Sequence, residues 1–256
     1  MSYFERTGGN SFRATEHVGG AWNTAEQHIA PAFGLLAHVV GCDRDARRDD
    51  GLVIGRLSYD ILGVLPIGDM DVEVTVLRPG RTIELVEAVL SHGGRAAVRL
   101  RAWLMAPAPP THSKLSATPD RLAGRDEALG RSEVWPGGFI ESAEIRRDQV
   151  EPGRASFWAR SPIPLLADEK VSDLAHAVRL FDISNGMTVR ADPKTVAFPN
   201  LDLTAHLFRQ PHGEWVGFDT TVSFGADGIG LTSSVLHDIY GPIGTMSQIL
   251  TVRPGT

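Results

Sequence analysis

Three polar residues interrupt apolar patterns in the C-terminal half of this 256-residue chain. Asp182 ends the apolar stripe of a helical pattern, and Asn200 opens an alternating strand pattern. Gln248 falls between Met246 and Leu250 on one strand face, because successive side chains of a strand point to opposite sides of its sheet. One carboxylate and two amides from three elements could polarise a water molecule, with the carboxylate as its base.

Each of these residues also has a structural interpretation, and the pattern alone leaves both open. Asp182 could bond toward Asn185 and Gly186, where glycine permits a left-handed helix end. Asn200 could be a polar strand start after a proline. Gln248 could fix strand register, since a buried amide without a partner costs roughly 1–3 kcal/mol.

The N-terminal half contains one helical pattern followed by four strand patterns. The helix is predicted over residues 23–41, with Asn23 or Thr24 as its N-cap and Gly41 as its end. The strands are predicted over residues 52–62, 70–77, 82–90 and 96–105.

The C-terminal half repeats this order of elements. Two extended segments, 139–147 and 155–163, precede a long helix over 165–186 and strands over 201–208, 215–224, 229–237 and 245–252. A helix packed against an antiparallel meander, repeated in tandem, predicts an α+β fold rather than a parallel α/β one.

A stretch rich in proline and small polar residues separates the two halves. We therefore predict an N-terminal domain over residues 1–106, a connector over 107–137 and a C-terminal domain over 138–256 that carries the three polar residues.

Composition and missing motifs exclude several classes of protein. The net charge of −6 argues against a basic nucleic-acid face, and the one cysteine excludes intramolecular disulfides and cysteine-based zinc sites. There is no apolar run of bilayer length and no signal-peptide pattern, so we expect a cytoplasmic protein without a membrane span. Nucleophile-elbow, phosphate-loop and dinucleotide motifs are absent, and the histidines show no metal spacing; we predict no metal and no cofactor.

Several segments resemble the acyl-CoA thioesterase II family of double-hotdog proteins. They are "EHVGGAWN", "AFGLLAHVV", "VTVLRPGRTIELVEAVL", "FDISNGM", "PNLDLTAHLFRQPHGEW" and "SQILTV". The resemblance implies a tandem pair of hotdog folds, each a long helix wrapped by an antiparallel sheet. It also implies hydrolysis of acyl-CoA to CoA and free acid, without a metal or covalent intermediate.

The resemblance places the family's catalytic Asp, Thr or Ser, and Gln on Asp182, Asn200 and Gln248. Asn200 departs from the family pattern, although an amide can also donate and accept hydrogen bonds. Trp22 and Asn23 are candidate substrate-binding residues in an acyl-pocket wall, or alternatively a packed tryptophan beside an N-cap. Backbone amides at a helix start or glycine turn are expected to supply the oxyanion donor.

Two other functions remain open at this stage. A non-catalytic hotdog protein that binds acyl-CoA or lipid is one, and Asn200 makes it conceivable. A hotdog dehydratase or hydratase is the other, although the usual Asp/His pair is missing from the helix. Exposed sheet edges predict a homodimer or larger homo-oligomer.

Overall fold

The computed structural model describes residues 1–107, 122 and 135–255. Most of the predicted connector, residues 107–137, therefore lies outside the described residues. The N-terminal half comprises β1 (Phe4–Gly8), β2 (Ser11–Ala14), the 3₁₀ turn η1 (Glu16–Val18), α1 (Ile29–Arg47), β3 (Val53–Ile61), β4 (Asp69–Arg78), β5 (Ile83–His92) and β6 (Arg95–Met105).

The C-terminal half begins with a short helix and two strands, and its helical layer follows them. It comprises α2 (Gly138–Ser142), β7 (Glu144–Glu151), β8 (Arg154–Arg160), α3 (Asp173–Val178), the 3₁₀ turn η3 (Phe181–Ile183), α4 (Ser184–Met187), β9 (Val196–Ala197), β10 (Asp202–Leu207), β11 (Val216–Phe224), β12 (Ile229–Asp238), β13 (Gly241–Thr251) and β14 (Arg253–Pro254).

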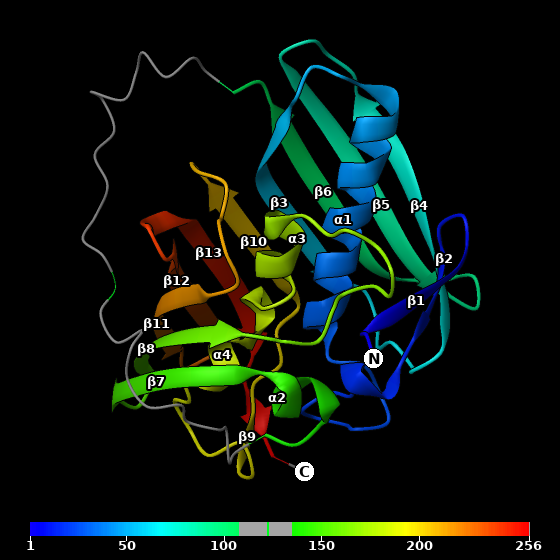
Figure 1. Ribbon diagram of the computed structural model, residues 1–256. Coiled ribbons are helices and arrows are strands. Elements are labelled where there is room, and N and C mark those ends of the chain that lie inside the picture. Colours follow the sequence, from blue (N-terminus) through cyan, green and yellow to red (C-terminus); the bar gives the residue numbers. More distant parts are fainter. Residues whose placement is uncertain (108–121, 123–134, 256) are drawn as a thin grey trace, which may run out of the picture.

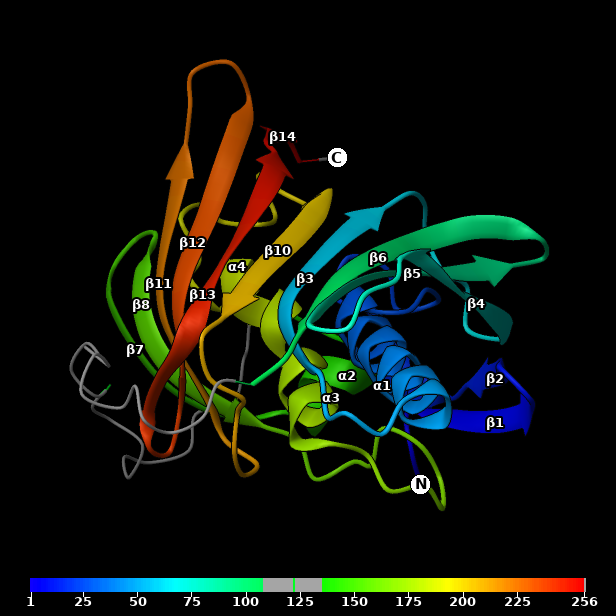
Figure 2. The same ribbon diagram turned by 90° about the horizontal axis from the view of Figure 1, so that it is seen from above.

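The two halves share one antiparallel sheet of twelve strands, in the order β1-β2-β4-β5-β6-β3-β10-β13-β12-β11-β8-β7. In each half the first strand of this sheet after the helical layer lies at the inner edge, and these two strands, β3 and β10, pair with each other. Figure 2 shows them side by side at the middle of the curved sheet. The predicted α+β class and the duplicated order of helix and strands are confirmed. The four strands of each half do not form a simple meander, because β3 pairs with β6 and β10 pairs with β13 rather than with the next strand in sequence.

The helices lie together on the concave side of this sheet (Figure 1). Helix α1 crosses α3 closely at Gly34, where an added Cβ would lie 2.5 Å from the Cβ of Arg179. On its sheet side, Phe33 stacks on Tyr59 with ring centroids 4.1 Å apart. The Tyr59 hydroxyl donates to the Phe33 carbonyl over 2.9 Å, so a buried polar group is satisfied. None of the helices in the described part of the chain combines the length and hydropathy needed to span a bilayer.

The first helix differs from its prediction at both ends. It begins at Ile29, and its N-cap is His28 rather than Asn23 or Thr24. The preceding segment is a turn whose backbone N–H groups bond elsewhere, including Gln27 N–H to the Leu65 carbonyl over 2.7 Å. The helix also runs past Gly41 to Arg47, because a glycine inside a helix costs only about 1 kcal/mol.

The long helix predicted over 165–186 is also wrong, because this segment breaks into α3, η3 and α4. Leu166 instead forms an isolated β-bridge with Phe4, and Phe4 N–H bonds to the Leu165 carbonyl over 3.0 Å. Asp168 then adopts a positive φ of 58°, which interrupts any helix, and Ser172 caps α3. The extended segment predicted over 139–147 is helical in its first part, as α2.

Candidate active site

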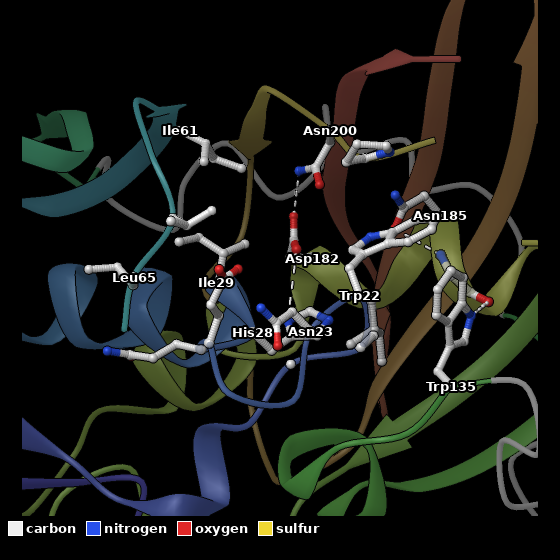
Figure 3. A pocket seen from close by; sticks show the side chains of 18 of the residues that line it. Trp22, Asn23, His28, Ile29, Ile61, Leu65, Trp135, Asp182, Asn185 and Asn200 are labelled. Carbon is white, nitrogen blue, oxygen red and sulfur yellow. Dashed lines mark hydrogen bonds and ion pairs between the residues drawn. The ribbon is translucent and has the colours of Figure 1, made fainter. Parts of the chain in front are cut away.

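Asp182, Asn200 and Gln248 lie in direct contact inside the C-terminal half. Asp182 is buried on η3, between α3 and α4. Its Oδ1 accepts one hydrogen bond from Asn200 Nδ2 over 2.7 Å and another from Gln248 Nε2 over 2.8 Å. Figure 3 shows the first of these bonds at the centre of the pocket. The structure thus brings together the three residues that the sequence singled out.

Strand β13 explains why the two amides meet the same oxygen. Along β13, Met246, Gln248 and Leu250 are buried while the residues between them are exposed, as predicted. Asn200 forms an isolated β-bridge with Leu250, two residues after Gln248. Because inward-facing residues of a strand are two positions apart, this bridge places Asn200 beside Gln248.

Ser184 completes the support of Gln248, and the sequence analysis did not identify it. Its Oγ donates to Gln248 Oε1 over 2.8 Å, and both side chains are fully buried. This bond orients the Gln248 amide so that Nε2, and not the oxygen, faces Asp182. The position of Ser184, two residues after Asp182, could have suggested a role in the site. Its partner Gln248 lies 64 positions away in the sequence, so the local pattern does not reveal the contact.

Asn200, unlike Gln248, lies in the wall of the cavity. Its Nδ2 donates to Asp182 Oδ1 and also, over 3.1 Å, to the Asp202 carbonyl. These two bonds use both amide hydrogens and leave the Asn200 Oδ1 acceptor without a partner among the described residues. Asn200 and Asp182 both line the cavity, whereas Gln248 lies behind Asp182 and is not part of its wall.

Burial raises the pKa of Asp182 to about 7, although the hydrogen bonds from Asn200 and Gln248 lower it. The cost of burying a charge without a cationic partner exceeds what two neutral amide donors return. A carboxyl group that titrates near neutrality can accept a proton from water and return it within one catalytic cycle.

His28 is a further member of this cluster that the sequence analysis missed. Its Nδ1 lies 3.9 Å from Asp182 Oδ2 and accepts a hydrogen bond from Ala30 N–H over 3.2 Å. Burial lowers the pKa of His28 to about 4, so the ring is neutral near pH 7 and the pair is not an ion pair. The position of His28, directly before the apolar helical stripe, could have suggested a polar residue at the start of the helix.

A cavity of about 560 Å³ opens beside Asp182, with walls from both halves of the chain. In Figure 3, Ile29, Ile61 and Leu65 lie on one side of Asp182, and Trp22 and Trp135 lie on the other. The cavity therefore has an aliphatic end and an aromatic end, with the carboxylate between them.

The aromatic end gathers residues that are distant in sequence. Trp22 packs edge-on against Trp135 at 4.6 Å and against Phe198 at 5.5 Å between ring centroids. Trp135, which falls in the predicted connector, donates from Nε1 to the Gly186 carbonyl over 2.9 Å. Asn23 also lines the cavity, and its Oδ1 accepts a bond from Ala25 N–H over 3.0 Å, in a turn rather than at a helix start.

Two domain descriptions match the chain in tandem. Residues 18–105 match the acyl-CoA thioesterase N-terminal domain, and residues 109–252 match the acyl-CoA thioesterase C-terminal domain. A comparison with curated proteins found no match.

Several solved structures share the fold over nearly the whole chain. A conserved protein of unknown function with a hotdog fold from Alicyclobacillus acidocaldarius has a TM-score of 0.75 and 12% identity, with 97% of this chain and 95% of that chain covered. A protein assigned as a thioesterase from Novosphingobium aromaticivorans has a TM-score of 0.74 and 16% identity, with 99% of each chain covered. Acyl-CoA thioesterase II TesB2 from Mycobacterium marinum has a TM-score of 0.65 and 14% identity, with 99% and 96% covered.

These structures are too distant in sequence to show more than the fold, which is the hotdog fold in tandem. The domain matches extend over both halves and include every residue of the Asp182 cluster. The chain therefore belongs to the acyl-CoA thioesterase family and is a thioester hydrolase with two hotdog domains in tandem.

Proposed function

We propose that this protein hydrolyses acyl-CoA to free acid and CoA with a water molecule activated by Asp182. The observation that carries the proposal is the asymmetry of the Asp182 carboxylate. Its Oδ1 accepts two amide hydrogen bonds, whereas its Oδ2 accepts none from the described residues. A base held by one oxygen at a cavity wall has its other oxygen available for water.

In this mechanism the water donates its two hydrogens to Asp182 Oδ2 and Asn200 Oδ1. Its lone pair then points at the carbonyl carbon of the thioester. Attack forms the new C–O bond while one water proton passes to Asp182. Collapse of the tetrahedral intermediate breaks the C–S bond, and Asp182 returns the proton to the departing CoA sulfur. Holding both reactants in this geometry lowers the barrier by several kcal/mol in favourable cases.

The start of α1 supplies a donor for the developing oxyanion. A helix begins with N–H groups that have no acceptor within the helix. Here His28 N–H bonds to the Val18 carbonyl over 2.7 Å, Ala30 N–H bonds to the His28 ring, and Pro31 has no N–H. The remaining N–H belongs to Ile29, which lines the cavity, and we assign it to the carbonyl oxygen.

Gln248 and Ser184 act through Asp182 and are positioning residues in this mechanism. Neither side chain belongs to the cavity wall, so neither touches the substrate. Ser184 orients the Gln248 amide, and Gln248 fixes Asp182 Oδ1 and stabilises its charged form. The sequence predicts that Gln248 holds the water molecule itself, whereas we propose that it holds Asp182.

Trp22 and Asn23 are proposed to contact the substrate at the aromatic end of the cavity. The predominantly apolar lining suits an acyl group, since apolar surface removed from water contributes about 25 cal/mol per Å².

Several properties stay predictions. They are a role in fatty acid metabolism, a cytoplasmic location, a homo-oligomeric state and the domain boundaries 1–106, 107–137 and 138–256.

The test is release of free thiol from acyl-CoAs with short, long and aromatic acyl groups, by wild type and Asp182→Asn. We expect wild-type turnover of at least one acyl-CoA and a loss of roughly 10²-fold or more in the variant. Equilibrium binding of the same acyl-CoAs is measured in parallel. Binding without turnover by the wild type would overturn the proposal in favour of an acyl-CoA-binding protein.

A further inference from the structure

The His28 imidazole stands on the cavity wall but has no part in the mechanism above. It caps α1 by accepting the Ala30 N–H hydrogen bond at Nδ1 over 3.2 Å. A neutral imidazole carries one hydrogen, on either Nδ1 or Nε2. Because Nδ1 accepts a hydrogen bond, the hydrogen is on Nε2.

Pairing with Asp182 does not change this tautomer. The 3.9 Å between His28 Nδ1 and Asp182 Oδ2 exceeds hydrogen-bond distance. A proton on Nδ1 would also abolish the N-cap bond to Ala30. Burial lowers the pKa of His28 to about 4, which keeps the ring neutral in the range where Asp182 is ionised.

The Nε2–H group has no acceptor among the described residues. Some described side-chain atoms are both buried and without a hydrogen-bond partner, and His28 Nε2 is not one of them. Nε2 is therefore not sealed from solvent. His28 retains 12% side-chain exposure and lines the cavity, so this exposure opens toward the ligand space. Phe139 packs against the ring at 4.6 Å between centroids and holds its orientation. A donor with a fixed tautomer thus belongs to a partly exposed side chain that lines the cavity.

We propose that His28 Nε2–H donates a hydrogen bond to the carbonyl oxygen of the thioester, as a catalytic residue of the reaction proposed above. The carbonyl oxygen then has two donors from adjacent residues, Ile29 N–H and His28 Nε2–H. Both are neutral and preorganised, so they stabilise the oxyanion without transferring a proton. The inference rests on the proposed function, because it needs a thioester carbonyl beside Asp182.

Two substitutions separate this role from helix capping. His28→Asn retains an oxygen acceptor near the Nδ1 position and so preserves the cap, but it has no donor near Nε2. His28→Gln places an amide N–H near the Nε2 position. We expect His28→Asn to keep wild-type thermal stability and to lose roughly 10²-fold in kcat, with KM changed little. His28→Gln should recover a substantial part of that loss.

A spectroscopic arm tests the hydrogen bond without turnover. Imidazole ¹⁵N NMR of the wild type should show the Nε2–H tautomer for His28 at neutral pH. Addition of an acyl-CoA ketone analogue, with a methylene group between carbonyl and sulfur, should shift the Nε2 resonance. A Nδ1–H tautomer, an Nε2 resonance that the ketone leaves unchanged, or a His28→Asn variant with wild-type kcat would overturn the inference. If wild type releases no thiol, the proposed function fails, and the NMR arm still decides whether His28 meets the ligand carbonyl.

Discussion

Gln248 Nε2 donates a hydrogen bond of 2.8 Å to Asp182 Oδ1 across 66 positions of sequence. Both residues are buried, and the amide is oriented by Ser184 from the far side. This contact joins the last long strand of the sheet to the broken helical layer above it. It also makes the two oxygens of Asp182 unequal, which is the basis of the mechanism proposed here.

Asp182→Asn is expected to stabilise the fold at alkaline pH. Burial raises the folded-state pKa of Asp182 to about 7, above its unfolded value of about 3.9, so the folded state binds the proton more tightly. The contribution of Asp182 to stability therefore falls as pH rises from about 4 to 7. The variant lacks this charge and should exceed wild type at pH 8 by up to roughly 4 kcal/mol, at 1.36 kcal/mol per pKa unit.

Urea denaturation of both proteins at pH 5 and pH 8 measures this effect. The free-energy difference between variant and wild type should grow from the lower to the higher pH. Asp148→Asn, at an exposed carboxylate on β7, is the matched control and should show no such growth. A difference between Asp182→Asn and wild type that is equal at both pH values would contradict the raised pKa.

Asn200→Ala should lower kcat and raise the pKa of Asp182 further, because the Asn200 hydrogen bond lowers that pKa. We expect a loss in kcat of roughly 10²-fold and an acid limb of the pH–rate profile displaced upward. Asn200→Thr is the comparison, since its hydroxyl can still donate to Asp182 and accept from water. An alanine variant with the wild-type profile would exclude Asn200 from the water site.

Gln248→Met removes an amide behind the cavity wall while keeping a similar side-chain volume. The Ser184 hydroxyl then lacks its acceptor, so stability should fall by about 1–3 kcal/mol. KM should stay near wild type while kcat falls, because Gln248 acts through Asp182. Ser247→Ala, at the exposed neighbour on β13, is the control. A rise in KM with unchanged kcat would instead place Gln248 in substrate binding.

Strand predictions succeeded because period-two alternation reflects a sheet with one buried face. The predicted strand over 82–90 corresponds to β5, and that over 96–105 corresponds to β6. The same alternation identified Gln248, since a buried amide on an apolar face is unusual. The local sequence pattern was therefore sufficient to predict a strand wherever buried and exposed positions alternate regularly along it.

Helix boundaries and the partners of the site were less predictable. The cap at His28 depends on Gln27 and His28 N–H groups that bond to distant carbonyls. His28 reaches the Asp182 cluster because α1 packs against the broken helical layer of the other half, whereas Ser184 joins it through Gln248 on the distant strand β13. Trp135 was assigned to a connector by composition, whereas its contacts with Trp22 and Gly186 place it in the cavity wall.

Trp22→Ala tests the aromatic end of the cavity at little expense in stability, because the side chain is 48% exposed. We expect KM to rise several-fold for the preferred acyl-CoA, from lost apolar and aromatic contact, while kcat changes less. Trp103→Ala is the matched control, since Trp103 lies outside the cavity wall. Equal rises in KM for both variants would remove Trp22 from the substrate site.

The most direct test of the central claim compares two titrations of the wild-type enzyme. Carbon-13 NMR follows the Asp182 carboxyl, assigned with Asp182→Asn, and steady-state kinetics gives the pH dependence of kcat/KM. The account predicts that Asp182 titrates near pH 7 and that kcat/KM rises with the same pKa, to a plateau above it. A carboxyl that titrates near pH 4, or a rate that rises with a different pKa, would contradict Asp182 as the base.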